Sequence, residues 1–238
     1  MKILIATTKT EHHKYFLNNL KIDEKNLSII FETKLSESSI YKNKKLLKKK
    51  NQVEKKLFSN HKFNKKFNKK NFKSINSLNC INFINDLSPN IIILFGTQIL
   101  KKIFLHKINC KNIFNLHGGN PEDYRGLDTL FWTIYHKDFN NLYSTLHKVN
   151  PRVDTGDIIE MKKIKISKDL NFFNIGYYNT QNCVDMVNNL IKKKLNNENL
   201  IFNKQKKLGR YYSKIPYSII KNCYYKLQKY VKDKYKNK

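Results

Sequence analysis

Short apolar runs alternate with helical stretches along this chain, and this alternation limits the possible folds more than any other feature of the sequence. The runs "KILIATT" and "LSIIFET" lie near the N-terminus, and "CINFINDLSPNIIILFG" combines a helical pattern, a Ser-Pro turn and a third apolar run. Continuous apolar runs of this length are typical of strands that are buried on both faces of a parallel sheet. The order strand, helix, strand predicts a doubly wound, mostly parallel α/β sheet, with functional loops at the carboxyl ends of the strands.

The pattern continues through the second half of the chain. "KNIFNLH" predicts a strand, residues 127–136 a helix, "LYSTLHKV" and "IIEMKKIKI" two further strands, and residues 169–195 a long helix. The segment after residue 200 differs, because "GRYYSKIP" is a turn and a basic amphipathic helix follows Pro216. We therefore expect a catalytic domain over residues 1–200 and a C-terminal extension over residues 201–238, whose helix docks on the core.

The chain carries 47 Lys and Arg residues against 18 Asp and Glu residues, a formal charge of +29. Such a charge suits nucleic acid or an anionic membrane surface. However, only three of the 47 are arginine, and the chain has a single alanine. Lys, Asn, Ile, Phe and Tyr have AT-rich codons, so a base-composition bias of the genome would produce much of the charge without a selected partner. We expect residues 40–73 to form one or two solvated helices rather than a nucleic-acid arm.

The stretch "NLHGGNPEDYRGLDTLFW", residues 115–132, departs from this bias. Residues 115–157 contain four basic and six acidic residues, a local charge of −2. Five of the seven glycines lie between Gly96 and Gly156. Something other than compositional drift fixes this segment.

The polar side chains of this segment suit acyl transfer. Asn115 and His117 are separated by one residue, so in a strand they point to the same face. The loop "RVDTGD" offers Asp154 and Asp157 as carboxylates that could orient or charge the imidazole. An amide, an imidazole and a carboxylate can stabilise an oxyanion and manage a proton while an amine attacks an acyl carbon.

Two motifs in order carry a family resemblance. "NLHGGNPEDYRG", followed after a helix by "STLHKVNPRVDTGDII", resembles the paired signature of the folate-dependent formyltransferases, and "SPNIIILFGTQIL" is similar to their central strand and folate-side turn. The resemblance covers about residues 75–165. It implies a Rossmann-like formyltransferase fold, 10-formyltetrahydrofolate as co-substrate, no metal, and transfer of a one-carbon formyl group to a substrate amine.

The resemblance also assigns residues to roles. It makes Asn115, His117 and Asp154 the catalytic set, with Asn115 and His117 stabilising the oxyanion and Asp154 orienting His117 and assisting removal of the amine proton through water. It places the pterin pocket along Leu94, Phe95, Gly96, Asn150, Val153 and Asp154. It gives a loop-shaping or substrate-binding role to Gly118, Gly119, Tyr124, Arg125 and Gly126. We expect His147 to be a structural strand residue, and we assign no chemistry to His12, His13, His61, His106 or His136.

The departures from the family pattern bear on the acceptor. Many members have His-Pro-Ser-Leu-Leu-Pro where this chain has "HGGNPE", and "ATTKTEHHK" lacks the glycine-rich phosphate loop of the glycinamide ribonucleotide enzyme. The residues after 201 do not suffice for the second barrel domain of methionyl-tRNA formyltransferase. We therefore expect a nucleotide-linked amino sugar as acceptor. The alternatives are a methionyl-tRNA formyltransferase-like activity and a non-catalytic basic binding protein on the same fold.

The remaining features concern location and partners. The four cysteines lie far apart without a CxxC pair, which indicates free thiols of a reducing cytoplasm. The first apolar run is too short for a signal peptide, and no window approaches the ~20 apolar residues of a membrane span. We expect a cytoplasmic protein with a small-molecule amine as partner, and nucleic acid only under the tRNA alternative. The apolar face of the C-terminal helix is compatible with a homodimer.

Overall fold

A mostly parallel sheet forms the centre of the molecule. The computed structural model describes residues 1–33, 45–58 and 67–236. Its main sheet has seven strands in the order β3-β2-β1-β4-β5-β7-β8, parallel from β3 to β5 and antiparallel at β7 and β8. The strands are β3 (Asn68–Phe72), β2 (Leu27–Glu32), β1 (Ile3–Thr7), β4 (Ile91–Phe95), β5 (Ile113–His117), β7 (Tyr143–Lys148) and β8 (Ile158–Lys163). The predicted fold class is confirmed.

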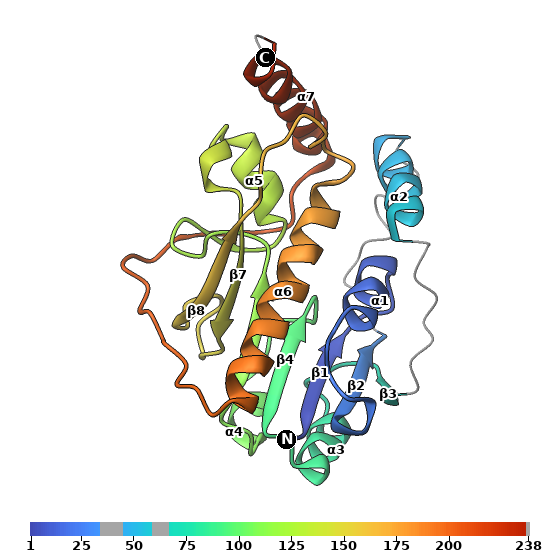
Figure 1. Cartoon of the computed structure of the whole chain (residues 1–238), viewed down its shortest axis with the longest axis vertical. Helices are drawn as coiled ribbons and strands as arrows, with labels where there is room; N and C mark the ends of the chain where they lie inside the picture. The colour runs from blue at the N-terminus through green and yellow to red at the C-terminus, as the bar shows by residue number, and fades with distance from the viewer. Residues whose placement is uncertain (34–44, 59–66, 237–238) are drawn as a thin grey trace.

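Both faces of the central strands are buried, as continuous apolar runs require. In β1, Ile3 and Ile5 pack with α1 (Glu11–Asn18) and α6 (Ile175–Leu195), while Leu4 and Ala6 face α3 (Leu78–Leu87) and α4 (Lys102–Lys107). Figure 1 shows α6 running diagonally beside β4, and α1 at the upper ends of β1 and β2. Each buried Ile or Leu stabilises the fold by about 1.5–3 kcal/mol, so these strands anchor the sheet.

The connections reverse direction between β1 and β4. The chain runs outward from β1 to β2 and β3 on one side, and from β4 to β5 on the other. Open α/β sheets bind ligands in the crevice beyond the carboxyl ends of the strands at such a switch point. The carboxyl end of β5, where Asn115 and His117 lie, borders this crevice.

The C-terminal segment packs on the second half of the chain. α7 (Tyr217–Lys234) buries Ile220, Cys223 and Leu227 against the region of α5 (Thr129–Tyr135), and Cys223 donates its thiol proton to the Phe131 carbonyl at 3.2 Å. This is the docking that the sequence predicts. The homodimer expectation relied on the same apolar face, and oligomeric state stays a prediction.

Two local features in the second half of the chain were not predicted. β9 (Arg210–Tyr212), expected to be a turn, pairs in parallel with β6 (Tyr124–Gly126) in a small second sheet. The long helix α6 begins at Ile175, six residues after the predicted start, because residues 169–174 form turns held by Asn171 and Asn174. Two 3₁₀ turns, η1 (Glu24–Asn26) and η3 (Phe139–Asn141), complete the elements described.

The Lys-rich segment is helical only in part. Residues 45–58 form α2 (Lys45–Phe58), as expected, but residues 68–72 form the edge strand β3. A strand was not predicted there because "NKKNF" has little β propensity, and pairing with β2 decides its conformation. The rest of the predicted segment lies outside the described residues.

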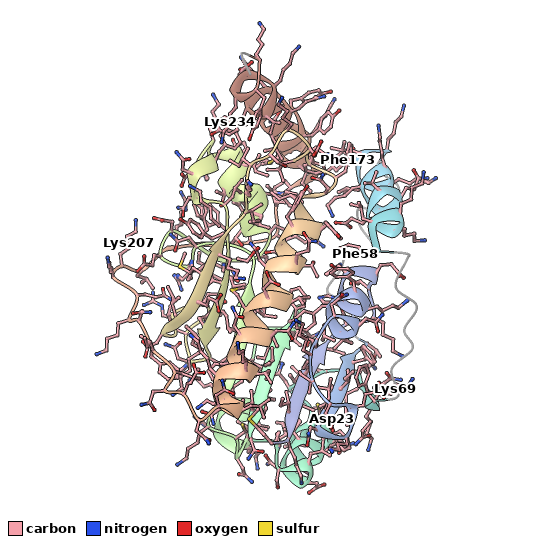
Figure 2. The ribbon with its side chains drawn as sticks, viewed as in Figure 1. Asp23, Phe58, Lys69, Phe173, Lys207 and Lys234 are labelled. Atoms are coloured by element: carbon pink, nitrogen blue, oxygen red, sulfur yellow. The ribbon has the colours of Figure 1, made fainter. Side chains whose placement is uncertain are left out.

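The positive charge is distributed over the surface. Figure 2 shows Lys69, Lys207 and Lys234 extending outward on different sides of the molecule. Such a distribution is what compositional bias produces. Within the part of the chain that the structure describes, no helix is long and apolar enough to cross a membrane.

Candidate active site

The structure brings the three predicted catalytic side chains together. Asn115 and His117 leave the same face at the end of β5, and Asp154 reaches them from the loop between β7 and β8. The Asn115 Nδ2 donates to Asp154 Oδ1 at 3.3 Å, and the His117 Nδ1 lies 3.5 Å from Asp154 Oδ2. Asp154 has a φ of 53°, in the left-handed region that few side chains adopt. The hydrogen bonds to its carboxylate hold it in this conformation.

A second histidine belongs to this cluster. His147 is the neighbour of Asn115 across the antiparallel pair of β5 and β7. Its Nε2 lies 3.2 Å from Asn115 Nδ2 and 3.4 Å from Asp154 Oδ1, while its Nδ1 donates to the Lys148 carbonyl at 2.9 Å. The sequence interpretation treated His147 as a structural residue. Pairing of the Asn-x-His and Thr-x-His strands could have indicated its place beside Asp154.

The Tyr124-Arg125-Gly126 loop holds the cluster from behind. His117 Nε2 donates to the Tyr124 carbonyl at 2.8 Å, which directs Nδ1 toward Asp154. The Gly126 N–H donates to Asp154 Oδ2 at 2.9 Å. Arg125 is buried and donates to the Val153 carbonyl at 3.0 Å and, through Nε, to the Gly209 carbonyl at 2.7 Å. These contacts agree with a loop-shaping role for Arg125.

Gly118 and Gly119, the two glycines after His117, also have defined neighbours. A Cβ on Gly119 would lie 2.9 Å from Thr129 Oγ1 and 3.2 Å from His117 Nε2. The Gly118 carbonyl accepts from Thr129 Oγ1 at 2.5 Å, and the Gly119 carbonyl accepts from Thr145 Oγ1 at 2.6 Å. The loop after His117 therefore packs too closely at Gly119 for a side chain, and two threonines fix its backbone.

The electrostatics leave Asp154 ionised. Burial alone would raise the pKa of Asp154, but the neighbouring His117 and His147 and the Gly126 N–H outweigh burial and hold that pKa well below its usual range. Burial lowers the pKa of His117 from 6.5, and the Asp154 carboxylate only partly offsets this. At neutral pH the site thus pairs an ionised carboxylate with a neutral imidazole.

The cluster forms part of the wall of a cavity of about 430 Å³. All the residues assigned to the pterin pocket line it, namely Leu94, Phe95, Gly96, Asn150, Val153 and Asp154. Asn115, His117, Gly118 and Gly126 also line it, whereas Gly119, Tyr124 and Arg125 lie behind the wall. The predicted residues therefore converge on one cavity at the switch point of the sheet.

Other residues of this cavity were not predicted from the sequence. They include His12 and His13 of α1, Lys50 and Glu54 of α2, and Asn179 and Thr180 of α6. His13 packs against Gly96, whose φ is +71° and whose added Cβ would lie 2.6 Å from His13 Nε2. His106 and His136 are not among the lining residues, and His61 lies outside the described residues.

The two α1 histidines make stability depend on pH. Burial lowers the pKa of His12 to about 4 and that of His13 well below 6.5. Below pH 6.5 each takes up a proton in the unfolded chain while it stays neutral in the folded protein, so their stabilisation is present above pH 6.5 and is lost as pH falls below it. The free energy of unfolding should fall by about 1–2 kcal/mol through His12 between pH 7 and pH 5, and further through His13, measured by urea unfolding. His12→Gln should flatten this slope, whereas His106→Gln, on the exposed surface of α4, should leave it unchanged.

Gly156 closes the loop that presents Asp154. A Cβ at this position would lie 1.7 Å from the Lys148 carbonyl oxygen, so a side chain cannot be accommodated without opening the loop. Gly156→Ala should lower the free energy of unfolding by roughly 2 kcal/mol or more in urea unfolding. Gly118→Ala, where the nearest atoms are 3.5 Å away, is the matched control and should cost much less. Equal stability of the two variants would contradict this account of the loop.

Comparison with known proteins supports the motif-based resemblance. Over 96 residues the chain is 32% identical to ArnA, a bifunctional polymyxin resistance protein from Wigglesworthia glossinidia brevipalpis. The match covers 40% of this chain and 14% of that protein, so it concerns a small part of the relative. No protein-family model matches the chain.

Solved structures resemble the chain over nearly its whole length. A 4-N formyltransferase from Francisella tularensis is 17% identical, with 95% of this chain and 87% of that chain covered and a TM-score of 0.61. The formyltransferase PseJ from Anoxybacillus kamchatkensis is 16% identical over 90% of this chain and 86% of that chain, with a TM-score of 0.52. Methionyl-tRNA formyltransferase from Clostridium thermocellum is 16% identical over 91% and 73%, with a TM-score of 0.54. The chain has the formyltransferase fold, as the sequence predicts.

Proposed function

We propose that this chain transfers the formyl group of 10-formyltetrahydrofolate to the amine of a nucleotide-linked amino sugar. The observation that carries the proposal is the convergence of Asn115, His117 and ionised Asp154 on the wall of one cavity. An amide donor, a neutral imidazole and a carboxylate in a buried site suit attack of an amine on an activated formyl carbon. Formyl transfer fits this set without further groups.

The cavity suits the folate donor in size and lining. Its volume of about 430 Å³ lies within the range of small-molecule sites. Leu94 and Phe95 give it an apolar wall at the end of β4, and the loop from Asn150 to Val153 lies on the same cavity. An apolar wall beside backbone donors and acceptors is what a flat heteroaromatic ring such as pterin requires. When bound, 10-formyltetrahydrofolate would supply the formyl carbon that the amine attacks.

In the proposed reaction, Asn115 stabilises the developing negative charge, while His117 and Asp154 manage the proton. Asn115 Nδ2 donates a hydrogen bond to the formyl oxygen, where negative charge develops as the new C–N bond forms. His117 Nδ1 takes the proton that leaves the acceptor amine, because this imidazole is neutral. Asp154 Oδ2 then stabilises the imidazolium, and the proton passes on to the folate nitrogen as the old C–N bond breaks.

Two observations support an amino sugar as acceptor. PseJ from Anoxybacillus kamchatkensis, which shares the fold, was solved with tetrahydrofolate and a formamido sugar linked to UDP. In addition, the cavity is lined by three acidic residues, Glu54, Asp128 and Asp154, against two basic ones, Lys50 and Arg152. This small excess of carboxylates suits the positively charged amine of an acceptor.

The division into residues 1–200 and 201–238 and the cytoplasmic location also belong to this proposal. The cytoplasmic location is supported by the cysteines, since all four are free thiols. Folate-dependent transfer to a sugar nucleotide would use small molecules of that compartment. α7 then serves as a brace for α5 at the edge of the site.

Mass spectrometry of the acceptor tests the proposed function. The purified protein is incubated with 10-formyltetrahydrofolate and a panel of nucleotide-linked amino sugars, glycinamide ribonucleotide and methionyl-initiator tRNA. A formyl mass increment on an amino sugar is the expected result. An increment on the tRNA alone would replace the acceptor proposed here, and no increment on any amine would overturn the catalytic interpretation.

A further inference from the structure

Asn179 presents an oriented amide to the cavity beside the loop that follows His117. A Cβ added to Gly118 would lie 3.5 Å from Asn179 Oδ1 and 3.6 Å from its Nδ2. Ser144 Oγ donates to Asn179 Oδ1 at 2.8 Å, and Asn182 Nδ2 donates to Ser144 Oγ at 3.3 Å. This relay fixes the amide so that Nδ2 points away from Ser144. Within the described residues no acceptor is bonded to that Nδ2, although Asn179 lines the cavity.

Glu54 places a carboxylate on the same part of the wall. A Cβ added to Gly176 would lie 2.7 Å from Glu54 Oε1, and Gly176 precedes Asn179 by three residues on α6. Residues three apart on a helix share a face, so Glu54 meets α6 one turn before Asn179, on the same face of the helix. Lys50 pairs with Glu54, and their side chains are only 15% and 16% exposed. The carboxylate is therefore held in place at the cavity wall.

The two groups have complementary hydrogen-bonding character. Asn179 Nδ2 can only donate, and the Glu54 carboxylate can only accept. A hydroxyl group is the simplest ligand that satisfies both, since its oxygen accepts one hydrogen bond while its proton is donated in another. Neither residue is needed for the charge and proton roles of Asn115, His117 and Asp154.

From this arrangement, and on the basis of the proposed function, we infer that Asn179 and Glu54 determine acceptor specificity by binding a hydroxyl group next to the reacting amine. The acceptor is then an amino alcohol unit, as in an amino sugar with a free neighbouring hydroxyl. Glu54 lies on α2, so the Lys-rich segment contributes one of the two residues of this subsite. The ion pair with Lys50 holds that residue in place. The folate donor occupies the Leu94 to Gly96 side and does not contact Asn179.

Steady-state kinetics of two Asn179 variants test this inference, with the amino sugar that gives the mass increment as acceptor. Asn179→Ala should raise the acceptor KM about tenfold and change kcat by less than about threefold, because one hydrogen bond to the substrate is lost. Asn179→Asp keeps the oxygen that faces Ser144 but replaces the donor, so it should raise KM further. The matched control is Asn189→Ala, an exposed asparagine of α6 bonded to Glu160, which should leave KM unchanged.

Two further measurements separate this inference from the proposed function. One uses an altered acceptor sugar, and the other follows binding of a folate ligand. With the parent protein, an amino sugar analogue that lacks the neighbouring hydroxyl should have a KM about tenfold higher than the sugar that carries it. With Asn179→Ala, the two sugars should have about the same KM. Binding of 5-formyltetrahydrofolate, followed by calorimetry, should be equal in parent, Asn179→Ala and Glu54→Gln. Glu54→Gln should raise the acceptor KM about tenfold, and its control Glu198→Gln, at an exposed position, should not.

The outcomes differ for the two claims. An active parent whose acceptor KM is unchanged in Asn179→Ala refutes the acceptor subsite and leaves formyl transfer intact. Weaker 5-formyltetrahydrofolate binding in Asn179→Ala would place the residue on the donor side and also refute the subsite. A parent that neither binds 5-formyltetrahydrofolate nor formylates any amine refutes the proposed function, and the subsite with it.

Discussion

Replacing His117 with alanine is expected to lower the rate of formyl transfer by about a thousandfold, because the site loses its proton acceptor. His117 is neutral and buried, and its Nε2 bond to the Tyr124 carbonyl leaves Nδ1 to take the amine proton beside Asp154. Within the described residues, His147 also has one ring nitrogen on a carbonyl and the other near Asp154, but that Nε2 lies 3.2 Å from the Asn115 amide. The measurement is kcat by quantitative mass spectrometry of the formylated sugar, with 5-formyltetrahydrofolate binding as a check on the folded site.

The pH profile sharpens this prediction. Because the neutral imidazole is the active form and burial lowers the pKa of His117, the rate of the parent should be constant near neutral pH and fall at a pH below 6.5. His117→Ala should lose this acidic decline together with its activity. His106→Ala, on the exposed side of α4, should retain both. A rate that instead rises toward acid pH would show that the imidazolium is the active form and contradict the proton transfer proposed here.

Asp154→Asn is expected to lower kcat by about a thousandfold as well. The carboxylate accepts from Asn115 Nδ2 on one oxygen and from the Gly126 N–H on the other. An asparagine amide has one oxygen, so one of these donors would face an NH₂ group and the arrangement of Asn115 or of the Tyr-Arg-Gly loop would be lost. The imidazolium of His117 would also lose its counter-charge.

Asp157 provides the matched control for Asp154. It lies three residues later in the same loop and does not line the cavity. Asp157→Asn should keep kcat within about threefold of the parent, because it changes the charge of the loop without touching the catalytic set. Equal loss in both variants would indicate that loop charge, and not the geometry at Asp154, controls the rate.

The sheet and the shared face of Asn115 and His117, two of the proposed catalytic residues, could be predicted because local sequence determines them. The buried strands are continuous apolar runs, so β1, β2, β4 and β5 follow from composition over a few residues. Asn115 and His117 share a face because alternate residues of a strand do so. The choice of Asp154 over Asp157 came from family resemblance, and the geometry places Asp154 within the cluster.

The features that the sequence did not predict depend on contacts between distant segments. β6 and β9 pair although more than 80 residues separate them, and three-residue strands carry no usable periodicity. His147 joins the site only because β7 runs antiparallel to β5 and sets it opposite Asn115. Glu54 faces the cavity only because α2 packs across α1 and α6, and a Lys-rich helix looks solvated from its sequence alone.

Transfer of a labelled formyl group tests the central claim most directly. The protein is supplied with 10-formyltetrahydrofolate that carries a heavy carbon isotope in its formyl group and with the amino sugar, and the product is followed by NMR. We predict that the labelled carbon appears as a formamide on the sugar, with tetrahydrofolate formed in equal amount, and that Asp154→Asn slows both while Asp157→Asn slows neither. Label that stays on folate or appears only as free formate would contradict the claim that this site joins a formyl donor to an amine.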